Sequence, residues 1–505
     1  MSAQPLAESL VQSVDWLAVA PPTIAAAVGL AVLVADLFLP EARKAVLGWI
    51  SVAGLAVAAL MLLPLLDGDR STFCVRGATR ACSYTADHFT LVIQFLVLGG
   101  ALLAALLSVT NLKDDERRVP PGEFWFLLLS SAAGAALLPA SRDLATLIVA
   151  LEVASLPAFA LVGIRHGDKR SSEAALKFFL SSVTATAVSL MGISFVYAST
   201  GTLYLTQVAQ RLAHVEGQLH TLAQTGVVLT LIGFAFKTAA VPFHFWVPDT
   251  YVGAPLPVAA YLSVVGKAVG FSGLILVTVV AFPSYADVWG PALAALAALT
   301  MTVGNVGALR QQATRAYSAV QLLAWSSVGQ AGYLLVPIAA AGYARDPQKA
   351  IGSTVAYALM YAAVNLGAFA VAALVGRSRA LNRISDYRGL YAANPLTALL
   401  LAFFLLCLAG LPPGVIGLFA KVTVFSAAVD AGLGWLAVVM AVNVVIALFY
   451  YLQWTALLFR APEGEAARHH VPAPLTAALA LTGVLGVALS GAPQLVLRFA
   501  ATGLF

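Results

Sequence analysis

The stretch GFAFKTAAVPFHFWVPDTYVGAPLPVAAYLSVVGKAVGF, which runs from Gly233 to Phe271, decides the expected fold. Most of it is apolar or aromatic, yet it holds two lysines, Lys237 and Lys267. An apolar run of this length fits a membrane, whose hydrocarbon core is crossed by about 20 helical residues. Pro242 follows Lys237 after five residues and removes a backbone donor, so the helix is expected to break beside a buried cation. Such interrupted helices are typical of hydrated cavities in transport proteins.

The composition of the whole chain also indicates a membrane protein. Of 505 residues, 61% are hydrophobic and 10% are charged, against roughly 25% charged residues in a soluble domain. The net charge is +5, but the basic residues are scattered between apolar runs and form no patch for nucleic acid. The three cysteines, Cys74, Cys82 and Cys407, lack the paired spacing of zinc or iron–sulfur ligands, so no metal site is expected.

Apolar segments of membrane-spanning length recur along the chain, and we count fourteen. Their approximate ranges are 19–39, 46–66, 89–110, 123–140, 144–164, 174–199, 223–246, 256–282, 289–309, 316–341, 350–376, 396–428, 434–458 and 473–494. The fold class predicted from this pattern is an all-α polytopic membrane protein.

The seventh and twelfth spans share one pattern, a proline break combined with a lysine. Lys237 precedes Pro242, and Lys421 follows Pro412 and Pro413. Matched interrupted helices indicate two inverted five-helix repeats with discontinuous helices 7 and 12. The expected divisions are 1–110 for helices 1 to 3, 111–282 and 283–458 for the two halves, and 459–505 for helix 14.

The distribution of Lys and Arg predicts the orientation, because positive residues are retained on the cytoplasmic side. With the N-terminus outside, the cytoplasmic loops hold sixteen of the 28 basic residues and the outer segments eight. We therefore expect a bacterial inner-membrane protein with both termini on the outer side. The first residues lack the basic region of a cleavable signal and are expected to remain on the protein. Cys74 and Cys82 then lie in an oxidising compartment, either as a disulfide or as two free thiols.

Glu152 lies in the middle of the fifth span, within LIVALEVASLPAF. An ionised side chain at the centre of a membrane helix is unfavourable by about 2.5 to 3.5 kcal/mol, so Glu152 is expected to face a cation or a neighbouring helix. Lys177, near the start of the sixth span, has two open interpretations. It pairs with Glu173 along its own helix, or it turns inward and pairs with Glu152, each stabilising the charged form of the other.

His244 follows Lys237 by seven residues, which corresponds to two helical turns along nearly the same face. Because imidazole titrates near neutral pH, His244 suits a proton relay; the alternative is a histidine that only satisfies the broken backbone. Lys267 stands about 16 Å inside its span, too far to reach water. Gly266 and Gly270 flank it and are expected to let neighbouring helices approach closely.

Lysine suits proton transfer because desolvation favours its neutral form and a nearby carboxylate favours its charged form. Arginine stays protonated and could not serve in this way. We therefore predict a hydrated line of polar side chains in the plane of the membrane. Its expected members are Glu152, Lys177, Lys237, Lys267 and Lys421, with Ser326, Ser327 and Gln330 on the tenth span.

These residues also carry a resemblance to a known family. The stretches are LEVASLPAF, EAALKFFLSS, the Gly233–Phe271 stretch, LLAWSSVGQAGYLL and LAGLPPGVIGLFAKVTVFSAA. Together they resemble the antiporter-like membrane subunits of respiratory complex I over about residues 85 to 455. Because Lys421 stands where M-type subunits usually carry a glutamate, and because the chain ends soon after its last span, the resemblance is to the N-type subunits.

The resemblance implies roles for individual residues. Glu152 and Lys177 would be the coupling pair, Lys237 the central proton carrier, His244 and Lys267 relays, and Lys421 the lysine toward the outer exit. It implies no cofactor in this chain, since flavin, iron–sulfur clusters and quinone would belong to partner subunits. Gln330 departs from the family, whose members often have histidine there, and glutamine cannot titrate.

Three functional classes follow. The first is a proton-translocating subunit of a redox-driven NADH-quinone oxidoreductase, a translocase without its own redox centre, whose partners are neighbouring membrane subunits, including other antiporter-like ones, and the lipid bilayer. The second is a subunit of a multisubunit cation/proton antiporter, which requires sodium-dependent transport. The third is a structural scaffold, which the unfavourable free energy of several buried charges argues against.

Overall fold

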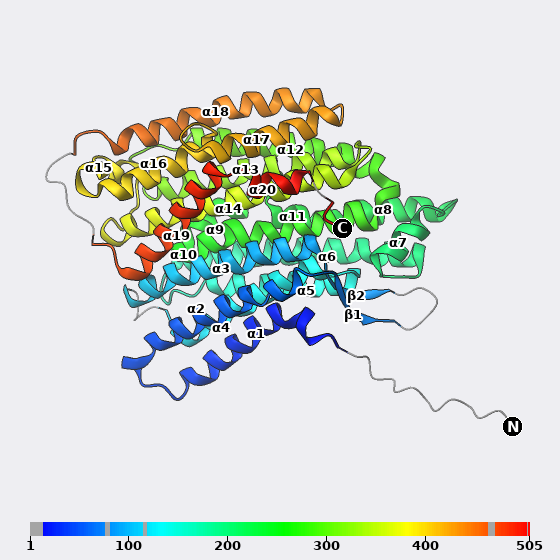
Figure 1. The fold of residues 1–505 in the computed structure, drawn as a ribbon, viewed down its shortest axis with the longest axis horizontal. Helices are drawn as coiled ribbons and strands as arrows, with labels where there is room; N and C mark the ends of the chain where they lie inside the picture. The colour runs from blue at the N-terminus through cyan, green and yellow to red at the C-terminus, as the bar shows by residue number, and fades with distance from the viewer. Residues whose placement is uncertain (1–13, 76–80, 115–118, 463–469, 502) are drawn as a thin grey trace.

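The structure is a computed structural model that describes residues 14–75, 81–114, 119–462, 470–501 and 503–505 (Figure 1). Residues 1–13, on which the expectation about a signal segment rests, lie outside the described residues. The long helices run side by side in one bundle (Figure 1). Their bounds are α1 Trp16–Asp36, α2 Ala45–Leu60, α3 His88–Asp114, α4 Pro121–Leu137, α5 Leu144–Val162, α6 Lys169–Thr200, α8 Gln218–Thr238, α12 Ala286–Leu309, α13 Ser318–Ala341, α14 Pro347–Ser378, α18 Gly434–Leu458 and α19 Ala473–Gly491.

Shorter helices complete the bundle around two breaks. They are α7 Leu205–Leu212, α9 Trp246–Gly253, α10 Leu256–Tyr261, α11 Lys267–Ile275, α15 Leu390–Ala393, α16 Pro395–Ala409, α17 Val415–Asp430 and α20 Gln494–Leu497. A π-helical turn, Leu262–Gly266, joins α10 to α11, and a second one, Leu276–Ala281, extends α11, so these segments form one continuous crossing.

The all-α polytopic fold is confirmed. Thirteen helices within the described ranges are long and apolar enough to cross a membrane. A further interrupted segment consists of α16 and α17, separated by residues 410–414. The seventh predicted span is also interrupted, since α8 ends at Thr238 and α9 starts at Trp246. Both expected discontinuities are therefore present, whereas the division into two inverted halves stays a prediction.

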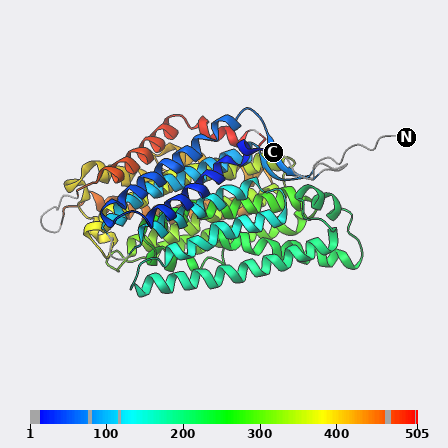
Figure 2. The ribbon, with the colours of Figure 1, turned by 90° about the horizontal axis from the view of Figure 1, so that it is seen from below.

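The centre of the bundle is formed by α13 and α14, in which nearly every residue is buried. The helices on the outside, such as α1, α18 and α19, bury a much smaller share of their residues. Figure 2 shows the N-terminal helices and the C-terminal helix on one side of the bundle and the helices from the middle of the chain on the other. Because the two central helices carry serines, tyrosines and a glutamine, polar groups are enclosed at the core.

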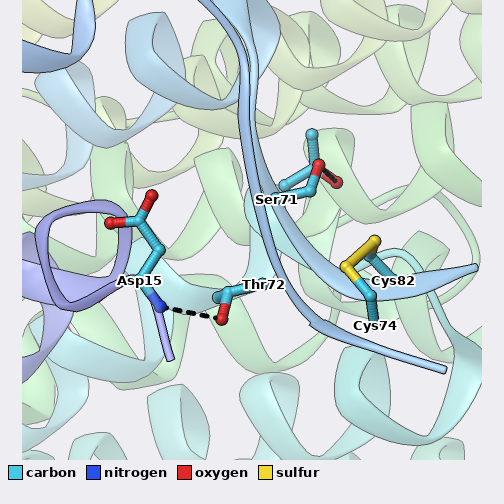
Figure 3. Close-up of a disulfide and its surroundings, with 6 residues drawn as sticks. Asp15, Ser71, Thr72, Cys74 and Cys82 are labelled. Carbon is cyan, nitrogen blue, oxygen red and sulfur yellow. Dashed lines mark hydrogen bonds between the residues drawn. A yellow bond between two sulfur atoms is a disulfide. The ribbon is translucent and has the colours of Figure 1, made fainter. Parts of the chain in front are cut away.

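A two-stranded hairpin, β1 Arg70–Cys74 and β2 Cys82–Ala86, is the feature that the all-α prediction missed. A disulfide joins Cys74 to Cys82 in register across the two strands (Figure 3). The hairpin also binds the start of α1, because the backbone N–H of Asp15 donates to Thr72 Oγ1 at 3.1 Å (Figure 3). Short strands bounded by a loop give a weak sequence signal beside long apolar helices.

Both ends of the described chain lie at one end of the bundle. Asp15, just before α1, forms an ion pair with Arg70 of β1. At the other terminus, the carbonyl of Leu504 accepts from the N–H of Phe89, in the first turn of α3, which directly follows β2. The even number of crossings expected from the sequence agrees with this arrangement.

Candidate functional site

Lys237 is buried in the last turn of α8, and its ammonium is directed at α5. Its Nζ donates a hydrogen bond to Ser155 Oγ at 2.7 Å. The same nitrogen lies 5.8 Å from the ring centroid of Phe159 and 5.2 Å from that of Phe178. The serine and the two aromatic rings therefore enclose the end of the Lys237 side chain.

The break after Lys237 leaves no exposed helix end. Ala239 adopts a left-handed conformation, with φ of 68°, and the N–H groups of Ala239 and Ala240 bond to carbonyls of the last turn of α8. The N–H of Val241 donates to Thr300 Oγ1 of α12 at 2.9 Å. Freed backbone groups at membrane depth must be satisfied by protein or water, and here protein groups serve that purpose.

Glu152 lies three residues before Ser155, one turn away on α5. Its side chain is half-buried, and its Oε1 is buried without a hydrogen-bond partner among the described residues. Glu152 and Lys237 are therefore both neighbours of Ser155, Glu152 along α5 and Lys237 across the contact between α5 and α8. Sequence reasoning selected two of the three and missed the serine, whose only signal was its position one turn after Glu152.

The expected inward pairing of Lys177 with Glu152 is not what the structure contains. Lys177 is exposed on α6, and its Nζ lies 2.7 Å from Glu173 Oε1 and 2.8 Å from Asp249 Oδ2. The alternative, an ion pair of Lys177 with Glu173 along α6, is therefore present, and Asp249 of α9 adds a second carboxylate. The physical reason is that α9 packs on α6 and brings Asp249 to the outward face on which Lys177 lies. Asp249 was the remaining charged residue in the Gly233–Phe271 stretch.

His244 lies within the break and not on the face of α8. Its expected position two turns above Lys237 was wrong, because α8 stops at Thr238. The imidazole is half-buried, its ring centroid lies 5.6 Å from a ring of Trp325 on α13, and its Nδ1 has no hydrogen-bond partner among the described residues. His244 therefore occupies the gap between α8 and α9, facing α13.

Lys267 is buried at the start of α11, and its Nζ also has no hydrogen-bond partner within the described ranges. One turn later, Gly270 packs so closely on the end of α8 that an added Cβ would lie 2.5 Å from Thr238 N. The close approach expected at Gly266 is absent, since a Cβ there would meet only its own helix, at Leu262. The contact at Gly270 places Lys267 beside the helix end that carries Lys237.

Lys421 is buried in α17, at the second break. Its Nζ donates to the carbonyls of Leu408, at 2.8 Å, and Ala409, at 2.7 Å, which are the last residues of α16. Gly410, with φ of 86°, ends that helix. The carbonyl end of a helix carries partial negative charge, so Lys421 is directed at a helix end and not at a carboxylate.

A polar cluster on α13, α14 and α18 occupies the core between the two breaks. Gln330 Nε2 donates to the hydroxyl of Tyr451 at 3.2 Å, and Gln330 Oε1 accepts from the hydroxyl of Tyr357. Ser326 Oγ is hydrogen-bonded to Tyr451 as well. The tyrosines were missed in the sequence because a buried tyrosine in an apolar helix resembles ordinary core packing.

A second hydrogen-bonded string starts at the neighbouring serine. Ser327 Oγ bonds to the hydroxyl of Tyr361 at 2.9 Å and to that of Tyr251 at 3.4 Å. Tyr251 belongs to α9, the helix that begins after the first break. Polar side chains on α13 therefore link the first break to the core of the bundle.

Several buried polar atoms along this line have no protein partner within the described part of the chain. They are Glu152 Oε1, His244 Nδ1, Lys267 Nζ, Tyr333 Oη and Asn365 Oδ1. Buried polar groups are almost always hydrogen-bonded, and ordered water provides the missing bonds where side chains do not. These atoms therefore mark positions where no described protein group joins one hydrogen-bonded segment to the next.

Outside the buried lysines, the described residues hold a large cavity but no cluster of metal ligands. No group of three or more His, Cys, Asp or Glu residues that could hold a metal occurs in the described ranges. A cavity of about 810 Å³ lies away from the buried lysines, where α2, α3 and α19 meet, and Lys44, Trp49 and Lys113 belong to its lining. The buried lysines and the core cluster remain the candidate site.

Comparison with known families gives one match across most of the chain. Residues 141–447 match the family described as NADH:quinone oxidoreductase/Mrp antiporter, TM. NADH-quinone oxidoreductase subunit N 2 of Streptomyces griseus is 74% identical over 514 residues, covering 99% of this chain and 96% of that protein. Subunit N of Salinispora tropica is 43% identical, over 89% of this chain and 86% of the relative.

Solved structures share the fold. A chain of respiratory complex I from Thermus thermophilus, 32% identical, superposes with a TM-score of 0.75 and covers 96% of this chain and 100% of that chain. A chain of the Mrp complex from a Dietzia species, 22% identical, reaches 0.81 over 96% of both chains and shows likeness of fold alone.

Proposed function

Because the chain belongs to the NADH:quinone oxidoreductase/Mrp antiporter family, as one of its subunit N members, we propose that it moves protons through the axis of buried lysines. The energy would come from a redox-driven NADH-quinone oxidoreductase in which it is a membrane subunit. It would work as part of a translocase, while flavin, iron–sulfur clusters and quinone would be held by partner subunits.

The observation that carries this proposal is the environment of Lys237. The side chain of Lys237 is buried and its Nζ lies 2.7 Å from Ser155 Oγ, with Glu152 one helical turn before that serine on α5. A change in the position or protonation of Glu152 alters how strongly the ammonium is stabilised relative to the neutral amine. Lys237 would therefore bind or release a proton when the carboxylate changes.

The route we propose continues from Lys237 to Lys267, which the Gly270 contact holds beside the end of α8. From there it crosses the core to Lys421, whose ammonium the carbonyls of α16 stabilise. His244, at the first break, would exchange protons with water held beside it. A proton leaving Lys421 would exit toward the outer side.

The proposed partners are neighbouring membrane subunits, including other antiporter-like ones. Lys177, Glu173 and Asp249 are exposed on the side of the bundle formed by α6 and α9, next to exposed apolar side chains such as Leu176 and Leu180. Charges at this position would be unfavourable against lipid tails, so protein is the better covering surface. The outer faces of α18 and α19 would contact the bilayer.

We propose a bacterial inner-membrane location with both termini on the outer side. The hairpin and both ends of the described chain share one end of the bundle. An outer location for that end fits the asymmetry of Lys and Arg in the loops and an oxidising environment for the Cys74–Cys82 disulfide.

The test is a Lys237→Ala variant in the complete oxidoreductase, with NADH oxidation and proton uptake measured in inverted membrane vesicles. Pumping should be abolished or strongly reduced while the complex still assembles. Lys349→Ala is the matched control, because Lys349 is exposed and its one ion-pair contact within the described ranges, to Asp430 Oδ2, is long at 4.0 Å. Full coupled pumping by Lys237→Ala would overturn the proposal.

The same vesicles separate the proposal from a cation/proton antiporter. A redox-driven pump acidifies the vesicles only while NADH is oxidised, whatever the sodium concentration. Proton movement that needs sodium and continues without NADH would assign the chain to an exchanger instead.

A further inference from the structure

The cavity of about 810 Å³ lies where five helix ends meet, outside the candidate site. The helices α2, α4 and α19 begin beside it, and α3 and α14 end beside it. Because α3 starts directly after β2 and ends at the cavity, the cavity lies at the end of the bundle opposite the hairpin (Figure 1). The orientation proposed above places this end on the cytoplasmic side.

The charged side chains that line the cavity are mostly basic. They are Lys44, Lys113, Arg377 and a single acidic residue, Glu41. The carboxylates of Glu41 and Asp36 lie 3.0 Å and 3.2 Å from Lys44 Nζ. Lys113 is exposed and forms no hydrogen bond or ion pair with the described residues. The lining therefore has a surplus of positive charge, and no described carboxylate neutralises Lys113.

Three helix N-termini add to this positive potential. Ala45, Pro121 and Pro474, in the first turns of α2, α4 and α19, belong to the lining. None of the three helices has a side-chain cap among the described residues. The first N–H groups of a helix have no partner within it and form the positive end of its dipole, so such ends favour bound anions.

The wall of the cavity also contains an unsatisfied hydroxyl. Thr110, one turn before Lys113 on α3, is 7% exposed, and its Oγ1 has no hydrogen-bond partner in the described part of the chain. Ser108 on the same helix instead donates to the carbonyl of Ala104 at 2.7 Å. Because buried hydroxyl groups are normally hydrogen-bonded, Thr110 indicates an acceptor that the described protein groups do not supply.

An apolar strip on the outside of α2 begins at the cavity. Trp49 lines the cavity and is 51% exposed. Exposed apolar side chains follow at helical spacing along the same helix, at Val46, Ile50, Val57 and Leu60. Tryptophan is enriched where lipid headgroups meet acyl chains. A basic cavity above an apolar strip therefore matches the two parts of a phospholipid.

We propose that this cavity binds the phosphate headgroup of an anionic phospholipid from the cytoplasmic leaflet. Lys113 and Lys44 would attract the phosphate, the Thr110 hydroxyl would donate to it, and the acyl chains would lie along α2. Basic pockets between membrane helices on this side suit anionic lipids. A zwitterionic headgroup would bring its own positive charge to a basic lining. This inference goes beyond the proposed function and needs only its membrane orientation.

The test uses the complete oxidoreductase in phosphatidylcholine nanodiscs that contain increasing fractions of a photoreactive phosphatidylglycerol. After illumination, labelled peptides are identified by mass spectrometry. Labelling is expected within residues 41–49 and 109–113. Unlabelled phosphatidylglycerol should reduce it, whereas additional phosphatidylcholine should not. Inorganic phosphate, compared with chloride at equal ionic strength, should also leave it unchanged.

Lys113 is the residue to substitute, because it is exposed and its loss breaks no ion pair among the described residues. Lys113→Ala should raise the phosphatidylglycerol fraction for half-maximal labelling about fivefold, which corresponds to about 1 kcal/mol for one basic residue. Lys113→Arg keeps the charge and should label as the unsubstituted protein does. Lys169→Ala is the matched control, because Lys169 is exposed at the same end of the bundle but lies outside the cavity lining.

Three outcomes would overturn the proposal. Competition by inorganic phosphate would show that the cavity takes a free anion. Equal labelling of Lys113→Ala and Lys113→Arg would show that lipid contacts only the apolar strip. No labelling of these peptides would show that a neighbouring subunit covers the cavity. Because the readout is labelling and not pumping, each of these failures leaves the proton-translocation proposal to be decided by Lys237→Ala.

Discussion

Gly270 and Gly266 provide a paired test of how α11 is held against the end of α8. An alanine Cβ at position 270 would lie 2.5 Å from both the backbone nitrogen and the hydroxyl of Thr238 and 2.8 Å from the carbonyl carbon of Lys237. Backbone atoms cannot yield at such distances, so α11 must move. At position 266 the nearest atom is 3.7 Å away, on the flexible side chain of Leu262.

The two substitutions share their gain in helix stability, about 0.5 to 1 kcal/mol for replacing glycine by alanine. Their difference therefore isolates the clash at Gly270. Overpacking typically lowers the free energy of unfolding by about 1 to 3 kcal/mol, so Gly270→Ala should be less stable than Gly266→Ala by that amount. It should also pump more slowly, because Lys267 moves away from the helix end that carries Lys237.

The assay is the thermal inactivation of the detergent-solubilised complex at one heating rate, together with proton pumping in vesicles. Gly266→Ala should match the unsubstituted protein or exceed it in stability. Equal destabilisation by both variants, or by neither, would refute the argument that Gly270 alone sets the approach of α11 to α8.

Two further predictions concern the hairpin end of the bundle. Partial burial raises the pKa of Asp15, but hydrogen bonds from the first N–H groups of α1 and from Arg70 outweigh it and hold the pKa below its ordinary value. Charged Asp15 therefore stabilises this cap above pH about 3.9, and the contribution is lost as pH falls through the lower folded pKa. Asp15→Asn should therefore speed hydrogen exchange in the first turn of α1 at pH 7. In acid, the variant and the unsubstituted protein should exchange at the same rate. Cys74 and Cys82 are bridged and Cys407 is buried, so a membrane-impermeant maleimide added to intact cells should label this protein only after reduction. Labelling of this protein without reductant would contradict the bridge.

The sequence by itself determined that most of this protein lies in a membrane and where its helices are interrupted. An apolar composition and the missing N–H of proline are local properties, so spans, interruptions near Pro242 and Pro412, and the depth of Lys237, Lys267 and Lys421 followed without a structure. Glu152 was selected for the same reason, because an ionisable group in mid-span is unfavourable wherever the helix packs.

Only the tertiary structure decided which side chains meet. Hydrophobic periodicity gives little information on helices that are buried all round, so α13 and α14 did not show which faces touch. Packing turned Lys177 outward to Asp249, gave Lys237 a serine on α5, and gathered tyrosines from three helices around Gln330. These partners are distant in sequence, and a buried tyrosine hydroxyl can be distinguished from ordinary core packing only when its hydrogen-bond partner is known.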